Sequence, residues 1–290
     1  MLRRQSSGTI KQSVTVEGIG IHTGTPSRIT LLPAPSGAGI VFRSRGVEIP
    51  ARAASVVDTS RCTVLGKDGV TISTVEHLMS AIASQRYDKR DLTNLYIDVE
   101  GVELPIGDGS ANLWVETLAG AGLHKIGTQK RLAPEGDLLI TGKNGSFITA
   151  FDAQFFSATV VVQFDHPLIG TQVAHFQAFP GNYAESIAPA RTFGFIEEVE
   201  ALRKAGLALG GNEDNAVVIY PDRYSRPLRF ENELARHKLL DLIGDLALAG
   251  LPFANMQIFA YKPSHGLNVE FAKKLAANDW DRENWYPFSG

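Results

Sequence analysis

Residues 236–246 read Arg-His-Lys-Leu-Leu-Asp-Leu-Ile-Gly-Asp-Leu and form the most informative segment of the chain. Successive residues of an α-helix turn by about 100°. His237, Asp241 and Asp245 are spaced four apart, so they share one polar stripe, with Lys238 at its edge and leucines opposite. A His and an Asp at positions i and i+4 can both reach one metal ion. The stripe therefore predicts two ligands of a metal site on a helix that runs from about residue 233 to 249.

The alternative is an ordinary amphipathic helix whose polar face meets solvent. Leu234 and Leu248 stand at the two ends of the stripe, and the stripe lacks the Glu and Lys richness of a solvated face. Gly244 also lies on it, where a missing side chain allows close approach of another backbone. These features favour a buried polar face.

The elements around this helix recur in the first half of the chain. After the helix we expect a strand at 256–261, a loop at 262–266 and a helix at 268–277. The first half has the same order, with a helix at 73–83, a strand at 95–99, a loop at 105–109 and a helix at 110–121. The earlier part of each half is rich in β-branched residues and turn signals, which favours antiparallel strands. The pattern predicts two copies of one α+β unit.

The boundary between the units is expected in the polar segment 124–136, which lacks helical or strand periodicity. We predict a first domain over 1–125, a linker over 126–136 and a second domain over 137–290.

A Glu-His pair opens the predicted helix of the first half, within Ser73-Thr74-Val75-Glu76-His77-Leu78. Ser73 and Glu76 fit a capping box, in which Glu76 has only a structural role. The alternative is that His77 is the third metal ligand and Glu76 is a base, since a carboxylate beside a metal site can take a proton from water. Both interpretations remain open from these residues alone.

Bulk properties exclude several classes of protein. The chain has 290 residues, a formal net charge of -3 and no basic stripe, so nucleic acid is not an expected partner. Cys62 is the one cysteine, which excludes an internal disulfide and a cysteine-rich metal site. No apolar run reaches the roughly 18 residues of a membrane span. We expect a monomeric cytoplasmic protein, with peripheral membrane association left open.

Motifs along nearly the whole chain resemble those of the UDP-3-O-acyl-N-acetylglucosamine deacetylases, which act in lipid A synthesis. The segment 73–78 resembles the signature of that family. The other matches follow in the family's order: GIGIHTG at 18–24, ELPIGDGSA at 103–111, ARTFGF at 190–195, GLALGG at 206–211, RHKLLD at 236–241, GDL at 244–246 and SHGLN at 264–268.

The resemblance implies a fold, a cofactor and site residues. Each domain would be a β-sheet packed on a pair of helices, with the two helix layers facing each other and the active site at their junction. Zn²⁺ would be bound by His77, His237 and Asp241, although Fe²⁺ accepts the same ligands. The resemblance further implies that Glu76 is the general base, that His265, oriented by Asp245, is a second acid-base group, that Thr192 stabilises the oxyanion, and that Lys238 and Phe193 contact the substrate.

An insert at 193–220 reads as strand, short helix, glycine-rich turn and strand, with an apolar stripe at Val199, Leu202 and Ala205. It is either a small satellite core or, by the resemblance, the passage for the acyl chain of the substrate. The segment 84–94 is longer and more charged than the usual link in the family, and Ser264 replaces a frequent glycine. These departures leave the proposed ligands, base and acid in place.

The sequence thus predicts a zinc-dependent hydrolase that removes the acetyl group of an acylated UDP-amino sugar, a small-molecule substrate. One alternative is a non-haem iron(II) oxygenase, because two His and one carboxylate also form its metal site. A helical His-Asp pair and an adjacent Glu base favour hydrolysis. A second alternative is a non-catalytic sugar-nucleotide or lipid-binding relative, which the intact set of site residues disfavours.

Overall fold

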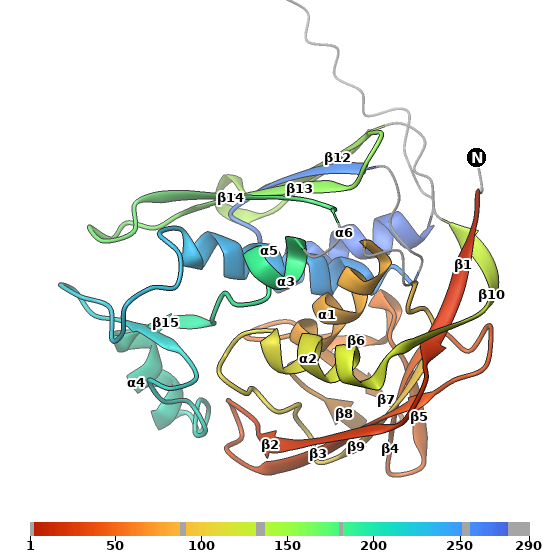
Figure 1. The fold of residues 1–290 in the computed structure, drawn as a ribbon. Helices are drawn as coiled ribbons and strands as arrows, with labels where there is room; N and C mark the ends of the chain where they lie inside the picture. The colour runs from red at the N-terminus through yellow and green to blue at the C-terminus, as the bar shows by residue number, and fades with distance from the viewer. Residues whose placement is uncertain (1–2, 88–90, 132–136, 180–181, 251–255, 278–290) are drawn as a thin grey trace, which may run out of the picture.

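The computed structural model describes residues 3–87, 91–131, 137–179, 182–250 and 256–277. Two β-sheets form the outer layers of the molecule, and the main helices lie between them (Figure 1). This is the mixed α+β architecture that the sequence predicted, with the helix layers of the two halves face to face.

The first sheet has the strand order β2-β3-β9-β4-β5. Its strands are β2 (Val14–Ile19), β3 (Pro26–Pro33), β4 (Ile40–Ser44), β5 (Val47–Pro50) and β9 (Leu95–Glu100). Alternate residues of the central strands, such as Ile29, Leu31 and Ile97, are fully buried. They cover one face of the sheet with apolar side chains, against which helices α1 (Glu76–Tyr87) and α2 (Asn112–Ala121) pack.

The second sheet has the strand order β11-β12-β17-β13-β14. Its strands are β11 (Leu138–Thr141), β12 (Phe147–Asp152), β13 (Ser157–Gln163), β14 (Thr171–Gln177) and β17 (Met256–Tyr261). Helices α5 (Glu233–Ala247) and α6 (His265–Ala277) cover its inner face. In each sheet the strand that comes last in the sequence, β9 or β17, lies between the second and third, pairing antiparallel with the second and parallel with the third. The identical topology confirms the predicted repetition of one α+β unit.

The two helix layers meet where α1 packs on α5. A Cβ atom built on Gly244 would overlap the backbone carbonyl oxygen of Glu76, so glycine allows this close approach. The polar stripe of α5 is buried as expected, and the exposed fractions of His237, Asp241 and Asp245 do not exceed 2%.

The segment predicted as a linker without strand periodicity contains a strand over much of its length, β10 (Leu123–Arg131), which pairs antiparallel with β1 (Arg3–Ile10). Backbone hydrogen bonds hold this pair of strands together, and the side chains over 123–128 are at least partly exposed. The strand therefore shows no alternation of apolar and polar residues in the sequence. Residues 132–136 lie outside the described ranges. The division into domains at 126–136 remains a proposal.

Some helix limits also differ from expectation. α1 begins at Glu76 rather than Ser73, because the Ser73 amide donates to Val102 O and Thr74 has a φ of 61°. It extends to Tyr87, so the charged segment 84–94 begins as helix, whereas 88–90 lie outside the described residues. His265 was expected in a loop and instead begins α6.

The insert follows the predicted order, with β15 (Phe193–Phe195), α4 (Ile196–Lys204), a glycine-rich turn and β16 (Val217–Ile219). In the view of Figure 1, the insert lies at the left of the molecule, below α5. The remaining elements are short: β6 (Val56–Asp58), β7 (Val64–Lys67), β8 (Val70–Ile72), α3 (Asn182–Ser186), and 3₁₀ turns η1 (Ala53–Ser55) and η2 (Lys143–Gly145). Among the described residues, no helix combines the length and apolarity needed to span a membrane.

Candidate active site

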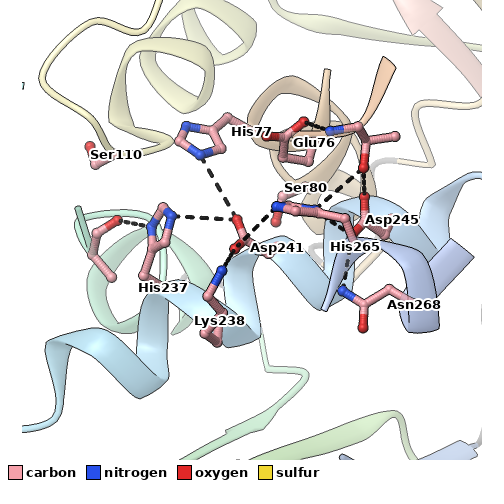
Figure 2. Close-up of polar contacts among 12 residues, drawn as sticks. Glu76, His77, Ser80, Ser110, His237, Lys238, Asp241, Asp245, His265 and Asn268 are labelled. Atoms are coloured by element: carbon pink, nitrogen blue, oxygen red, sulfur yellow. Dashed lines mark hydrogen bonds and ion pairs between the residues drawn. The ribbon is translucent and has the colours of Figure 1, made fainter. Parts of the chain in front are cut away.

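A group of three buried side chains that can hold a metal ion lies where α1 meets α5. His77 comes from α1, and His237 and Asp241 come from α5 (Figure 2). One potential ligand atom from each lies within 4.8 Å of the others. Asp241 Oδ1 is buried without a hydrogen-bond partner among the described residues, and it lies 3.4 Å from His237 Nε2 and 3.9 Å from His77 Nε2. An unsatisfied buried carboxylate oxygen facing two imidazoles fits a cation between them.

Backbone contacts orient both imidazole rings. His237 Nδ1 lies 3.1 Å from Ala190 O, and the backbone of Ser110 is a polar neighbour of the His77 ring. A proton on Nδ1 leaves Nε2 free as the ligand atom. Burial, followed by the neighbouring His237, lowers the pKa of His77 to about 3, and burial also lowers the pKa of His237. Both rings are therefore neutral near pH 7, as metal ligation requires.

Asp241 is held ionised by its neighbours. Burial favours the protonated carboxyl, but His237 and Lys238, the next largest influences, bring its pKa well below the usual range. Lys238 Nζ lies 2.9 Å from Asp241 Oδ2 and 5.6 Å from the centre of the Phe193 ring. The two predicted substrate contacts, Lys238 and Phe193, thus lie together beside the metal-binding group.

Glu76 has the environment of a base rather than of a capping residue. Its Oε2 accepts a hydrogen bond from the Thr63 amide at 3.0 Å, whereas the Ser73 amide donates to Val102 O. The side chain is buried, and burial raises its pKa to about 7. A carboxylate that titrates near neutral pH is suited to accept a proton at that pH.

His265 and Asp245 form a hydrogen-bonded pair in the same site (Figure 2). His265 Nδ1 lies 2.9 Å from Asp245 Oδ2, which also accepts a hydrogen bond from Asn268 Nδ2 at 2.9 Å. Burial alone would lower the pKa of His265, but Asp245, together with Asp241 and Glu76, raises it to about 9. The imidazole is therefore cationic at neutral pH and can donate a proton.

Thr192 lies immediately before β15, and its position depends on both halves of the chain. Its amide donates to Gly109 O of the first half at 2.8 Å, and its carbonyl accepts from the Val217 amide at 2.8 Å. Thr192 is therefore fixed at the rim of the site by backbone bonds on both sides.

A cavity of about 590 Å³ connects these side chains to the insert. Its lining contains every predicted site residue except Asp245, which lies behind His265: Glu76, His77, Thr192, Phe193, His237, Lys238, Asp241 and His265. From the insert, Phe195, Val199, Leu202 and Ala208 line it, whereas Leu207 and Ala205 do not. Two of the three residues of the apolar stripe, Val199 and Leu202, therefore face this cavity from helix α4.

The sequence interpretation missed the residues that support this site from behind. Glu103 is buried and accepts hydrogen bonds from the amides of His22 and Thr23 and from the hydroxyls of Thr23 and Thr74. It thereby ties the glycine-rich motif at 18–24 to the turn that precedes Glu76. Thr63 and Asn268 were also missed. Asn268 and Glu103 lie within the motifs at 264–268 and 103–111, but their partners are distant in the sequence, and no local pattern marks Thr63.

Comparisons with known proteins agree with this arrangement. The family model of the UDP-3-O-acyl N-acetylglycosamine deacetylases (LpxC) matches residues 7–277. The chain belongs to this family. Among similar proteins, the UDP-3-O-acyl-N-acetylglucosamine deacetylase of Syntrophotalea carbinolica is 41% identical over 279 residues, which are 93% of this chain and 87% of that protein. The proteins of the same name from Nitratiruptor sp. and Myxococcus xanthus are 40% and 38% identical, and the alignments cover 92% and 93% of this chain and 89% and 86% of theirs.

Family membership places the observed geometry in context. The match extends across both α+β units, so it includes both α1 and α5, which supply the potential metal ligands. The recognition made from short motifs is confirmed over most of the chain.

Proposed function

We propose that the protein hydrolyses the acetamide of UDP-3-O-acyl-N-acetylglucosamine, releasing acetate and UDP-3-O-acyl-glucosamine, in the cytoplasmic synthesis of lipid A. One observation carries the proposal: the buried His77, His237 and Asp241 group shares a single cavity with Glu76 and His265. The names of the related proteins support the same substrate.

We propose Zn²⁺ as the metal, held by His77, His237 and Asp241. Catalytic zinc sites use three protein ligands of this kind, although Fe²⁺ accepts the same set. When bound, the ion supplies Lewis-acid polarisation of a carbonyl and lowers the pKa of water.

The protein's own side chains would divide the remaining work between a base and donors to the developing negative charge. Glu76 accepts a proton from the attacking water as the new C–O bond forms. The Thr192 hydroxyl and the protonated His265 donate hydrogen bonds to the carbonyl oxygen, and fixed donors of this kind are worth about 3–4 kcal/mol in acyl transfer. The C–N bond then breaks, and the amine takes its proton from Glu76 or His265, both of which line the cavity.

The UDP-sugar and the acyl chain of the substrate would contact different parts of the cavity. Lys238 and Phe193 would contact the sugar and the adjoining diphosphate, as a cation and an apolar ring suit these groups. The insert would hold the acyl chain against Phe195, Val199 and Leu202, which line the cavity. Part of the insert also forms a satellite core around Ile219, Ile169 and Leu234, so β16 supports the fold while α4 borders the passage.

The two alternatives are less well supported. An iron(II) oxygenase has no use for a buried carboxylate with a pKa near 7 beside its metal, and the family match favours hydrolysis. A non-catalytic binding protein would not need the hydrogen-bonded pair of Asp245 and His265.

The test is to incubate the purified, metal-loaded protein with UDP-3-O-acyl-N-acetylglucosamine and to quantify acetate and the free amine by mass spectrometry. Chelation should abolish release, and refilling with Zn²⁺ should restore it. Substrate binding without acetate release by the metal-loaded protein would contradict the proposal, and oxygen consumption coupled to substrate oxidation would favour the oxygenase.

A further inference from the structure

Thr63 lies behind the site and contacts both the proposed base, Glu76, and the Asp245–His265 pair. It is the residue before β7, its exposed fraction is 0%, and it does not line the cavity. Because it is buried outside the cavity, Thr63 cannot contact the substrate. Its backbone and its side chain bond to different partners, and each partner has a role in the proposed function.

The backbone of Thr63 holds the start of α1. Its amide donates to Glu76 Oε2 at 3.0 Å, and its carbonyl accepts from the Val75 amide at 3.4 Å. One carboxylate oxygen of the proposed base is thus held by a hydrogen bond, while the side chain lines the cavity.

The side chain of Thr63 holds Asp245. Thr63 Oγ1 donates to Asp245 Oδ1 at 2.5 Å. The second oxygen of Asp245 accepts from His265 and Asn268. Because a hydroxyl has one proton, the Thr63 contact to His265 Nδ1, at 3.4 Å, is not a second donated bond. The His265 Nδ1 proton is consequently directed to Asp245, and Nε2 faces the cavity.

We infer that Thr63 is a positioning residue that fixes the spacing and orientation of Glu76 relative to the Asp245–His265 pair. This inference rests on the proposed function for its effect on turnover. The buried Asp245 carboxylate needs all of its donors, since an unsatisfied buried oxygen destabilises the arrangement that contains it. Without the Thr63 hydroxyl, Asp245 can rotate and His265 loses its defined orientation.

The test compares Thr63→Val, which removes the hydroxyl and keeps the shape and the amide, with Thr63→Ser, which keeps both polar groups. Loss of a group that orients a site residue typically costs about 10–100-fold in activity. We expect Thr63→Val to lower kcat by that factor with KM and metal content unchanged, and Thr63→Ser to retain most of the wild-type kcat. In a His265→Ala background, Thr63→Val should cause no further loss, because the two act through one pathway.

Thr93→Val is the matched control, since Thr93 is equally a buried threonine whose hydroxyl is hydrogen-bonded, to Ser7 Oγ at 3.0 Å, but it does not line the cavity. It should lower Tm without changing kcat. If Thr63→Val behaves like Thr93→Val, or if Thr63→Ser is as impaired as Thr63→Val, the inference is overturned.

A second readout does not depend on turnover. The imidazole Nδ1–H signal of His265, identified by its absence in His265→Ala, should be protected from solvent exchange in the wild type and in Thr63→Ser, and should broaden in Thr63→Val. Absence of acetate release by the wild type would refute the proposed function alone, whereas an unchanged His265 signal in Thr63→Val would refute the role of Thr63.

Discussion

The pKa values of Glu76 and His265 are both raised, but for different physical reasons. Burial makes the charged form of Glu76 unfavourable and raises its pKa to about 7. Burial has the reverse effect on His265, and the carboxylates around it, above all Asp245, overcome this effect and raise its pKa to about 9. Between these values Glu76 is ionised and His265 is protonated, which is the combination that the proposed mechanism requires.

We therefore expect a bell-shaped dependence of kcat/KM on pH. Activity should rise as Glu76 loses its proton near pH 7 and fall as His265 loses its proton near pH 9. The His265→Ala protein should lose the descending arm while it keeps its metal. A pH profile of this variant that matches the wild type would remove His265 from the mechanism.

Glu76→Gln tests the base directly. Gln keeps the size of the side chain and an oxygen for the Thr63 amide but cannot accept the proton, so the rate should fall by about 10²–10⁴-fold with metal content unchanged. Circular dichroism and metal analysis serve as controls for the fold and the site. Turnover near that of the wild type would show that Glu76 has only a structural role.

At the scale of elements, the distance between α1 and α5 depends on Gly244. A methyl group there would meet the Glu76 carbonyl and force the helices apart. Gly244→Ala should lower the free energy of unfolding by about 1–3 kcal/mol, as overpacked cores do, and should reduce kcat because Glu76 moves with α1.

Gly120→Ala provides the control for the Gly244 prediction. Gly120 lies in α2, and a Cβ atom there would meet nothing within 4 Å. Alanine should be neutral or stabilise the protein by about 0.5–1 kcal/mol, because it lowers the conformational entropy of the unfolded chain. Denaturant unfolding of both variants measures the difference, and equal stability of the two would contradict the close contact of α1 with α5.

The insert should determine how well the acyl chain is accepted. Leu202 lines the cavity, so Leu202→Glu should reduce kcat/KM for a long-chain substrate far more than for a substrate without an acyl chain, since each buried methylene contributes about 0.8 kcal/mol. The exposed Leu207 does not line the cavity, and Leu207→Glu is the control that should affect neither substrate. Equal losses on both substrates in Leu202→Glu would leave the insert with a structural role only.

At the scale of the whole molecule, the potential metal ligands join its two halves. His77 comes from the first half, and His237 and Asp241 come from the second. A metal that binds only the folded protein should stabilise both halves together, by about 2.7 kcal/mol at a free concentration of 100 times Kd. Thermal unfolding should therefore show one transition that Zn²⁺ shifts upward. His237→Ala should abolish both the shift and metal binding, and full metal occupancy in that variant would refute the ligand assignment.

Local sequence was enough to predict the features that depend on periodicity and residue type. The spacing of His237, Asp241 and Asp245 predicts one helical stripe, and the order of elements around it predicts a repeated α+β unit whose sheets indeed share one topology. Short motifs were enough to identify the family, because the site residues lie within them. These properties follow from neighbours along the chain, whose relative positions the helix or strand itself determines.

Only the tertiary structure shows which side chains from distant segments lie together. The buried carboxylate of Glu76 accepts from the Thr63 amide, and the Ser73 amide donates to Val102 O, so the two residues do not form the capping box that the sequence allowed. The role of Glu76 as a base is the proposal that this geometry supports. Thr63 carries no local signal, and the pairing of β10 with β1 joins ends of the first half that are more than a hundred residues apart. Such contacts depend on how distant segments meet, and burial together with neighbouring charges then shifts the pKa values of Glu76 and His265.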